Sequence, residues 1–265
     1  MFGLRSLREA NLGRTLLSVL AALSLLVSTV PVALSHQAPT GVTKASAAYH
    51  ESRFTETAPV YALAKVRKLI KGIKPTKIND DESSLALSAK VFEGLSVQAK
   101  FTYCMIHGEV STQNCDMMPA IVGEENKIFA RIPGAFDSEQ SWSDRQTSFM
   151  EKHRETLIDL IRATIKSQHQ VGVNLKHAIL ELDASSLIPD LVAVYKQTHQ
   201  RDNDILTVCC LLMKSGKYKP FVTSQSYRKL YGDENASYKS YIEGNDANKA
   251  LTIQRAMAFY KTRKG

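Results

Sequence analysis

The sequence predicts a mainly α-helical protein, arranged either as an irregular helical bundle or as a short α-solenoid-like array of helical hairpins, with one disulfide-closed loop. Apolar residues recur at steps of three and four over most of the chain after residue 57. Capping residues precede several of these stretches, and an imperfect internal repeat follows residue 174. Together these observations indicate helices that pack in consecutive pairs.

The first 35 residues have the features of an export signal. Three arginines precede an uncharged run, Leu16 to Val30, and small residues follow at Ala33 and Ser35, which suits cleavage by a signal peptidase. We therefore expect residues 1–35 to be a signal peptide and the protein to be exported, either periplasmic or secreted. The alternative is a membrane-anchored protein, because the charge-free stretch 15–35 approaches the roughly 20 residues of a membrane span.

The charge balance favours anionic partners. The formal net charge is +8, and the predicted signal holds three arginines and one glutamate, so about +6 remains on the rest of the chain. A moderate positive field attracts acidic surfaces and also aids solubility. Because export argues against nucleic acid, we expect a protein or envelope component as partner, with an anionic surface as a further candidate.

Residues 36–56 are rich in Ala, Ser, Thr and His without apolar periodicity, and we expect a flexible spacer there. A single helical domain should follow over residues 57–265. Its first helix is predicted from Thr57 to about residue 73, with apolar residues on one face and basic residues on the other. Such a helix either lies on an anionic membrane surface or packs against the rest of the protein with its basic face in solvent. The candidate binding residues on it are Lys65, Lys68 and Lys71.

Further helices are predicted over 84–100 and 141–167, and the segment 121–136 is expected to be a loop with at most a brief strand. The longer helix begins with a Ser-x-x-Asp capping pattern. Trp142 and Arg145 near its start are candidate binding anchors, since exposed Trp and Arg often carry interface energy.

The internal repeat supports the hairpin architecture. Six residues match positions 31 further along the chain, where helix, turn and a proline-initiated second helix recur: Leu175, Ile179, Leu182, Leu187, Pro189 and Leu191. A last helix is expected after Asn245, which can cap it. Two imperfect copies are fewer than a repeat fold needs, so the helical bundle stays open as the other architecture.

The four cysteines form two close pairs. In an exported protein an even number of cysteines suggests disulfides, and the sequence predicts one between Cys104 and Cys115. Cys209 and Cys210 are adjacent within an apolar run, so we expect them to be buried thiols that pack as small hydrophobic groups.

The segment Tyr103–Met118 holds the densest set of reactive residue types. Its candidate catalytic residues are His107, Glu109, Cys115 and Asp116. A disulfide would make the segment a structural or binding loop. A free Cys115 could act as a nucleophile with a distant histidine as base. The spacing matches no established metal-ligand pattern, and we expect neither a metal nor a cofactor.

The sequence contains no glycine-rich phosphate loop, no His-Glu-x-x-His and no Gly-x-Ser-x-Gly. These observations favour an exported, non-catalytic helical protein that binds a macromolecular partner at the cell envelope or outside the cell. The alternative function is an exported hydrolase that uses Cys115 or a metal held by the Tyr103–Met118 loop.

Overall fold

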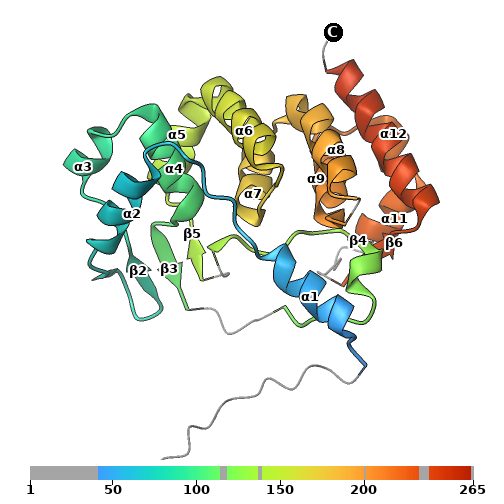
Figure 1. Cartoon of the computed structure of the whole chain (residues 1–265), viewed down its shortest axis with the longest axis horizontal. Coiled ribbons are helices and arrows are strands. Elements are labelled where there is room, and N and C mark those ends of the chain that lie inside the picture. Colours follow the sequence, from blue (N-terminus) through green and yellow to red (C-terminus); the bar gives the residue numbers. More distant parts are fainter. Residues whose placement is uncertain (1–40, 114–117, 137–138, 200, 233–238, 264–265) are drawn as a thin grey trace, which may run out of the picture. The chain divides into compact units, whose positions relative to one another are not determined.

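The computed structural model describes residues 41–113, 118–136, 139–199, 201–232 and 239–263. The chain divides into two units, residues 1–37 and 38–265, and the described residues all belong to the second. This unit is mainly helical, as the sequence predicts (Figure 1). Within the described ranges, none of the helices has both the length and the apolar character needed to cross a membrane.

The helices are short and several end at a glycine or a polar cap. In chain order they are α1 (Lys44–Arg53), α2 (Leu63–Lys71), α3 (Ala89–Glu93), α4 (Val97–Ile106), α5 (Asp144–Lys152), α6 (Arg154–Gln168), α7 (Val173–Glu181), α8 (Ile188–Gln197), α9 (Asn203–Ser215), α10 (Lys219–Val222), α11 (Gln225–Tyr231) and α12 (Asp246–Thr262). Two 3₁₀ turns, η1 (Glu124–Asn126) and η3 (Ser185–Leu187), connect them.

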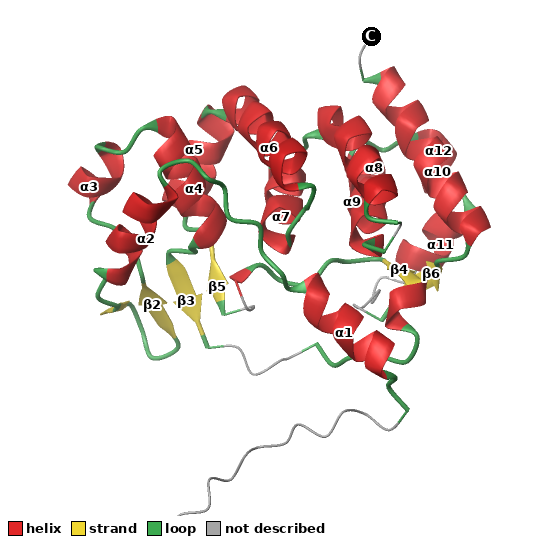
Figure 2. Cartoon of the chain, in the orientation of Figure 1, coloured by secondary structure: helices red, strands yellow, loops and turns green. Residues whose placement is uncertain are grey.

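Two small antiparallel sheets lie along the lower side of the helices in Figure 2. The first has the order β1-β2-β3-β5, with a register that pairs Ser83 with Ser111 and Ser111 with Gln140. The second pairs β4 with β6 through Ile128 opposite Ile242. The strands are β1 (Thr76–Lys77), β2 (Glu82–Ser84), β3 (Val110–Thr112), β4 (Lys127–Phe129), β5 (Gln140–Ser141) and β6 (Tyr241–Glu243).

The core runs through the packed helices α4 and α6 to α9. α9 contacts α7, α8, α12 and β4, and α6 contacts both α7 and α8. Ten of the residues of α9 are buried, and seven of them, including Cys209 and Cys210, are apolar. α9 is therefore the central helix of the C-terminal half.

The predicted flexible spacer is wrong for residues 44–53, which form α1. The helix has no apolar stripe, and its stability comes from polar anchors. Arg53 is 2% exposed and binds both oxygens of Asp204, at 2.8 and 3.0 Å, and one oxygen of Glu124, at 2.7 Å. Its guanidinium also lies 4.3 Å from the ring centre of Phe129. Burial lowers the pKa of Arg53, but the neighbouring groups, Asp204 and Glu124 chief among them, together outweigh this and the net shift is upward.

Three predicted helix boundaries are also wrong. Residues 55–60 have no regular secondary structure, and the backbone of Thr57 pairs with the side chain of Asn174, so α2 begins only at Leu63. The predicted helix 84–100 divides into α3 and α4, and the predicted helix 141–167 divides at His153 into α5 and α6. Polar caps set some of these boundaries: the N-caps Ser88 and Ser96 start α3 and α4, and a capping box between Ser143 and Gln146 starts α5. The N-caps of α2 and α6, Ala62 and His153, make no side-chain cap hydrogen bond.

The elements of the internal repeat recur in the structure. α7, η3 and α8 correspond to α9, the turn after it, and α10, and both Pro189 and Pro220 occupy the first turn of their helices. The second copy departs from the first because α10 has four residues and α11 follows it. The final helix begins as predicted, since the side chain of Asn245 accepts a hydrogen bond from the Asn248 amide.

The predicted disulfide-closed loop is not supported. Cys104 is a free, fully buried thiol in α4, where it faces the core, and Cys115 lies outside the described residues. Burial raises the pKa of Cys104 and of Cys209, the latter to about 12. Cys209 and Cys210 are buried free thiols, as predicted.

Candidate functional site

Glu109 lies at the centre of a polar cluster that we call the Glu109 cluster. Tyr103, Ser143 and Arg145 all donate to its carboxylate: the Tyr103 hydroxyl at 2.8 Å, the Ser143 hydroxyl at 2.5 Å, and Arg145 through two nitrogens. Glu109 is 2% exposed. With four donors on its two oxygens, the carboxylate is fully used in holding α4, β3 and α5 together.

The residues next to the Glu109 cluster also hold secondary-structure elements together. The amide of Gln146 donates to the carbonyl of His107 and accepts from the backbone of Glu109. His107 binds the carbonyl oxygen of Leu85 through Nε2 at 2.7 Å, so that nitrogen carries the proton. The indole of Trp142 donates to the Cys104 carbonyl at 2.6 Å. These contacts connect secondary-structure elements of the fold.

The sequence-predicted catalytic residues are therefore only partly brought together. His107 and Glu109 are buried and bonded to the fold, while Cys115 and Asp116 lie outside the described residues. Among the residues that the structure describes, no group of three or more His, Cys, Asp or Glu could hold a metal ion. The candidate anchors Trp142 and Arg145 are partly buried, and both bond to neighbouring elements.

Two histidines, the buried His107 and the half-buried His177, predict a pH dependence of stability. Burial lowers the pKa of His107 and of His177, whose Nε2 donates to the Pro133 carbonyl at 2.6 Å. Their contribution to stability is complete above the unfolded-state pKa of about 6.5. It is lost as the pH falls through the lower folded-state values, by up to about 1.4 kcal/mol per pH unit for each group. Urea unfolding at pH 7.5 and 5.5 should show this loss.

A double variant, His107→Gln/His177→Gln, provides the control for that measurement. It keeps a donor at each position and cannot titrate. We expect it to lose less stability than the wild type over the same pH interval, and an equal loss in both proteins would contradict the assignment.

A groove between α2 and α3 is the better candidate for a binding site, and we call it the α2 groove. It has a volume of about 650 Å³. Its floor is apolar, with Leu69 and Ile73 from the α2 side and Ala86, Leu87 and Val91 from the α3 side. Val91 remains 39% exposed. Three lysines border the groove: Lys65, Lys68 and Lys74.

The local sequence explains why the basic side chains point outward here. Val66 is buried and Leu69, Ile70 and Ile73 are partly buried against the core, which leaves the basic residues between them on the solvent side. Lys68 and Lys71 also lie in the last helical turn, where positive charge stabilises the helix dipole. The result is a dense row of cations beside an apolar groove.

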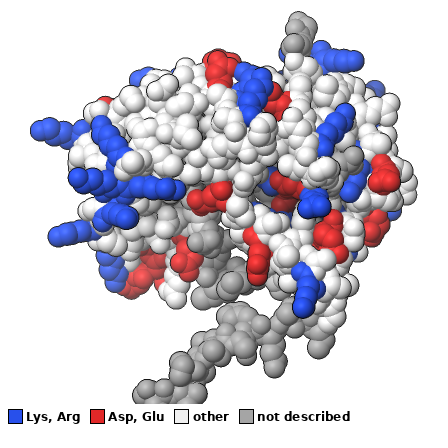
Figure 3. All heavy atoms as spheres, viewed as in Figure 1, with Lys and Arg blue, Asp and Glu red and all other residues white. Residues whose placement is uncertain are grey.

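This row carries charge that the fold does not neutralise. Within the described ranges, none of the five basic residues from Lys65 to Lys74 forms an ion pair, whereas Lys77 and Lys100 nearby pair with Asp80 and Glu93. Figure 3 shows Lys and Arg side chains gathered on the left of the molecule, over α2 and α3. A ligand that is both acidic and apolar would therefore gain the most binding free energy in the α2 groove.

Two of the three lysines predicted as binding residues lie at this groove. Lys65 and Lys68 line it, and Lys71 is exposed on the same helix outside the lining. The opposite wall, Ala86 to Val91, was not predicted because those residues were assigned to a continuous helix. We found no match to this chain among protein-family models, curated proteins or solved structures.

Proposed function

We propose that this is an exported, non-catalytic binding protein that takes an acidic, amphipathic segment of a partner protein into the α2 groove. The observation that carries the proposal is a row of cations beside an apolar groove, none of which forms an ion pair in the part of the chain that the structure describes. Acidic side chains of the partner would pair with Lys65, Lys68 and Lys74, and its apolar side chains would cover Leu69, Ile73 and Val91. In this proposal the α6 to α9 hairpins act as a short solenoid-like scaffold that supports the groove.

The concave form of the groove favours a protein segment over a membrane surface. A membrane-bound helix buries a convex apolar face, yet Val66 and Leu69 of α2 already pack against the protein core. Part of the apolar surface that remains open, including Val91 at 39% exposure, lies inside the groove, where individual side chains can enter. Charge complementarity across such a surface raises association rates and fixes orientation.

The proposal is tested by selecting a random peptide display library on the immobilised full chain. We expect the enriched peptides to combine Asp or Glu with large apolar residues. The variant Lys65→Gln/Lys68→Gln/Lys74→Gln should bind a synthetic copy of such a peptide at least about tenfold more weakly, because each charge-assisted contact contributes on the order of 1 kcal/mol. Raising the salt concentration should weaken binding to the wild type more than to the variant.

The matched control is Lys196→Gln/Lys219→Gln/Lys229→Gln. It removes three exposed lysines from α8, α10 and α11, which lie outside the groove, and it should bind the peptide as the wild type does. Equal binding by both triple variants would overturn the proposal. Binding to vesicles that contain anionic lipid, without any peptide enrichment, would instead identify a membrane partner.

A further inference from the structure

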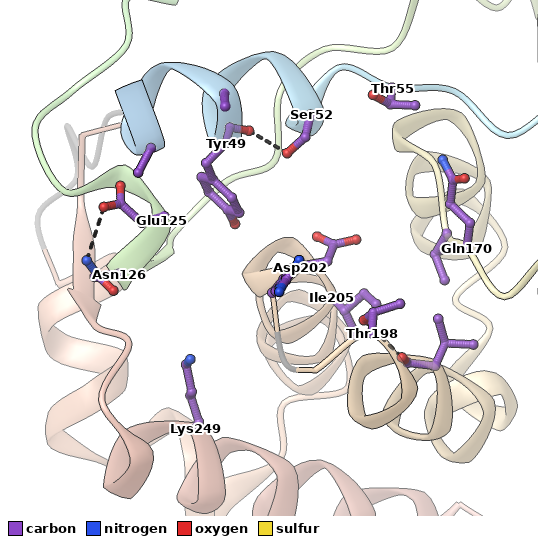
Figure 4. Close-up of a pocket in the computed structure, with 15 residues that line it drawn as sticks. Tyr49, Ser52, Thr55, Glu125, Asn126, Gln170, Thr198, Asp202, Ile205 and Lys249 are labelled. Carbon is purple, nitrogen blue, oxygen red and sulfur yellow. Dashed lines mark hydrogen bonds between the residues drawn. The ribbon is translucent and has the colours of Figure 1, made fainter. Parts of the chain in front are cut away.

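A hollow of about 740 Å³ lies beneath α1, and we call it the α1 cavity (Figure 4). Helix α1 and η1 form one side, and α8, α9 and α12 form the others. Its carboxylates already have partners. Both oxygens of Asp202 lie 2.8 Å from Lys176, and Glu125 accepts hydrogen bonds from Ser46 and Asn126. The acidic groups of the α1 cavity are therefore used by the fold.

Two other hollows adjoin each other and carry charge of opposite sign. The α2 groove has three lysines at its border, of which Lys74 is the last along the chain. A hollow of about 480 Å³ begins at the next residue, Pro75, and we call it the acidic hollow. One cation, Lys77, lines it together with four acidic residues: Asp80, Asp81, Glu82 and Glu139. Figure 3 shows acidic side chains at the lower left, below the basic side chains over α2 and α3.

Most of the charge in the acidic hollow is not neutralised by the fold. Lys77 pairs with Asp80, at 2.6 Å, and both side chains stay mostly exposed to solvent. In the described ranges the other three carboxylates, those of Asp81, Glu82 and Glu139, form no ion pair. The lysines of the α2 groove form none there either. The basic and the acidic surface of one chain therefore do not neutralise each other, and both remain available to a partner.

An exposed apolar side chain accompanies each of the two surfaces. Ile78 lies between Lys77 and Asn79, which both line the acidic hollow, and it is 56% exposed. Val91 lines the α2 groove and is 39% exposed. The segment 78–82, Ile-Asn-Asp-Asp-Glu, is thus acidic and also presents an apolar side chain. This is the composition that the α2 groove favours.

We propose that the partner of the α2 groove is a second copy of this chain, and that two copies form a closed dimer with twofold symmetry. The inference rests on the proposed function, because it names the partner of the same groove. The lysines of each copy would face the acidic hollow of the other, and Ile78 would cover Val91 across the interface. Because the two surfaces adjoin, a single twofold rotation brings both pairs of opposite charge together. Charge complementarity then fixes the orientation of the two copies.

Sedimentation velocity of the full chain over a series of concentrations measures this association. We expect a monomer–dimer equilibrium whose dissociation constant rises at least about tenfold between about 50 and about 500 mM salt, because exposed charge pairs are screened. Reversing the basic surface, in Lys65→Glu/Lys68→Glu/Lys74→Glu, should give a monomer. In a dimer of this variant, carboxylates would face carboxylates at both contacts.

Reversing the acidic hollow, in Asp81→Lys/Glu82→Lys/Glu139→Lys, should also give a monomer, since cations would then face cations. An equimolar mixture of the two reversed variants should dimerise as the wild type does, because opposite charges meet again at both contacts. Recovery of the dimer in the mixture also shows that both variants fold.

The matched control is Lys196→Glu/Lys219→Glu/Lys229→Glu, which reverses three exposed lysines outside both hollows and should dimerise as the wild type does. A monomeric wild type, assemblies that grow beyond a dimer, a dimer that persists in either reversed variant, or a mixture that stays monomeric would each overturn the inference. Peptide enrichment on a monomeric wild type would overturn the dimer alone. A dimer with the expected reversals but without peptide enrichment would instead overturn the wider proposal of binding to other proteins.

Discussion

Replacing Arg53 by methionine is expected to lower the free energy of unfolding by about 3 to 5 kcal/mol. The substitution keeps much of the apolar stem but removes the guanidinium that neutralises two buried carboxylates. Asp204 and Glu124 are 0% and 1% exposed, so each would remain charged and desolvated or would have to take up a proton. Burial raises the pKa of Glu124, but hydrogen bonds from His50 and Arg53 outweigh this and lower it overall.

Urea unfolding at pH 7 measures this effect, and limited proteolysis shows whether α1 is released. The control is Arg67→Met, an exposed position of α2 without an ion pair in the described part of the chain, which should change stability by less than about 0.5 kcal/mol. If Arg53→Met is no less stable than Arg67→Met, the anchoring role of Arg53 is wrong.

Replacing Glu109 by glutamine should have the second-largest effect, a loss of about 2 to 3 kcal/mol. The side chain keeps its size, but its amide nitrogen would face donors from Tyr103, Ser143 or Arg145 where an acceptor is needed. Because Arg145 is 29% exposed, water can replace part of its lost contact, which keeps the loss below that expected for Arg53.

Thermal and urea unfolding of Glu109→Gln provide the measurement, with Glu93→Gln as control. Glu93 is 70% exposed and pairs with Lys100, so its replacement should cost much less stability than that of Glu109. A catalytic role for Glu109 predicts a different result, namely unchanged stability in Glu109→Gln.

Apolar periodicity predicted the core helices well and failed where polar contacts decide the structure. The stripes of α6, α7, α9 and α12 are visible in the sequence because those helices bury apolar side chains. α1 has no such stripe, since its docking depends on Asp204 and Glu124, which lie 151 and 71 residues away along the chain. Periodicity within a window cannot contain that information.

The candidate sites likewise have parts that follow from local sequence patterns and parts that depend on the tertiary fold. The exposed lysines of α2 follow from helical spacing, but the groove beside them needs Ala86 to Val91, whose position depends on the break before α3. The Cys104–Cys115 prediction assumed a loop around Cys104, whereas the residue lies within α4. The α1 cavity is lined by residues from more than four elements, and only the tertiary fold brings them together.

The anchoring of α1 has a consequence for the order in which the chain folds. A ribosome makes α1 before any other described helix. Asp204, one of the two carboxylates that bind Arg53 of α1, is added 151 residues later. Contacts at such sequence separation form slowly because a long loop must close first. We therefore expect α1 to remain undocked during most of synthesis and to close over the cavity as one of the last steps of folding.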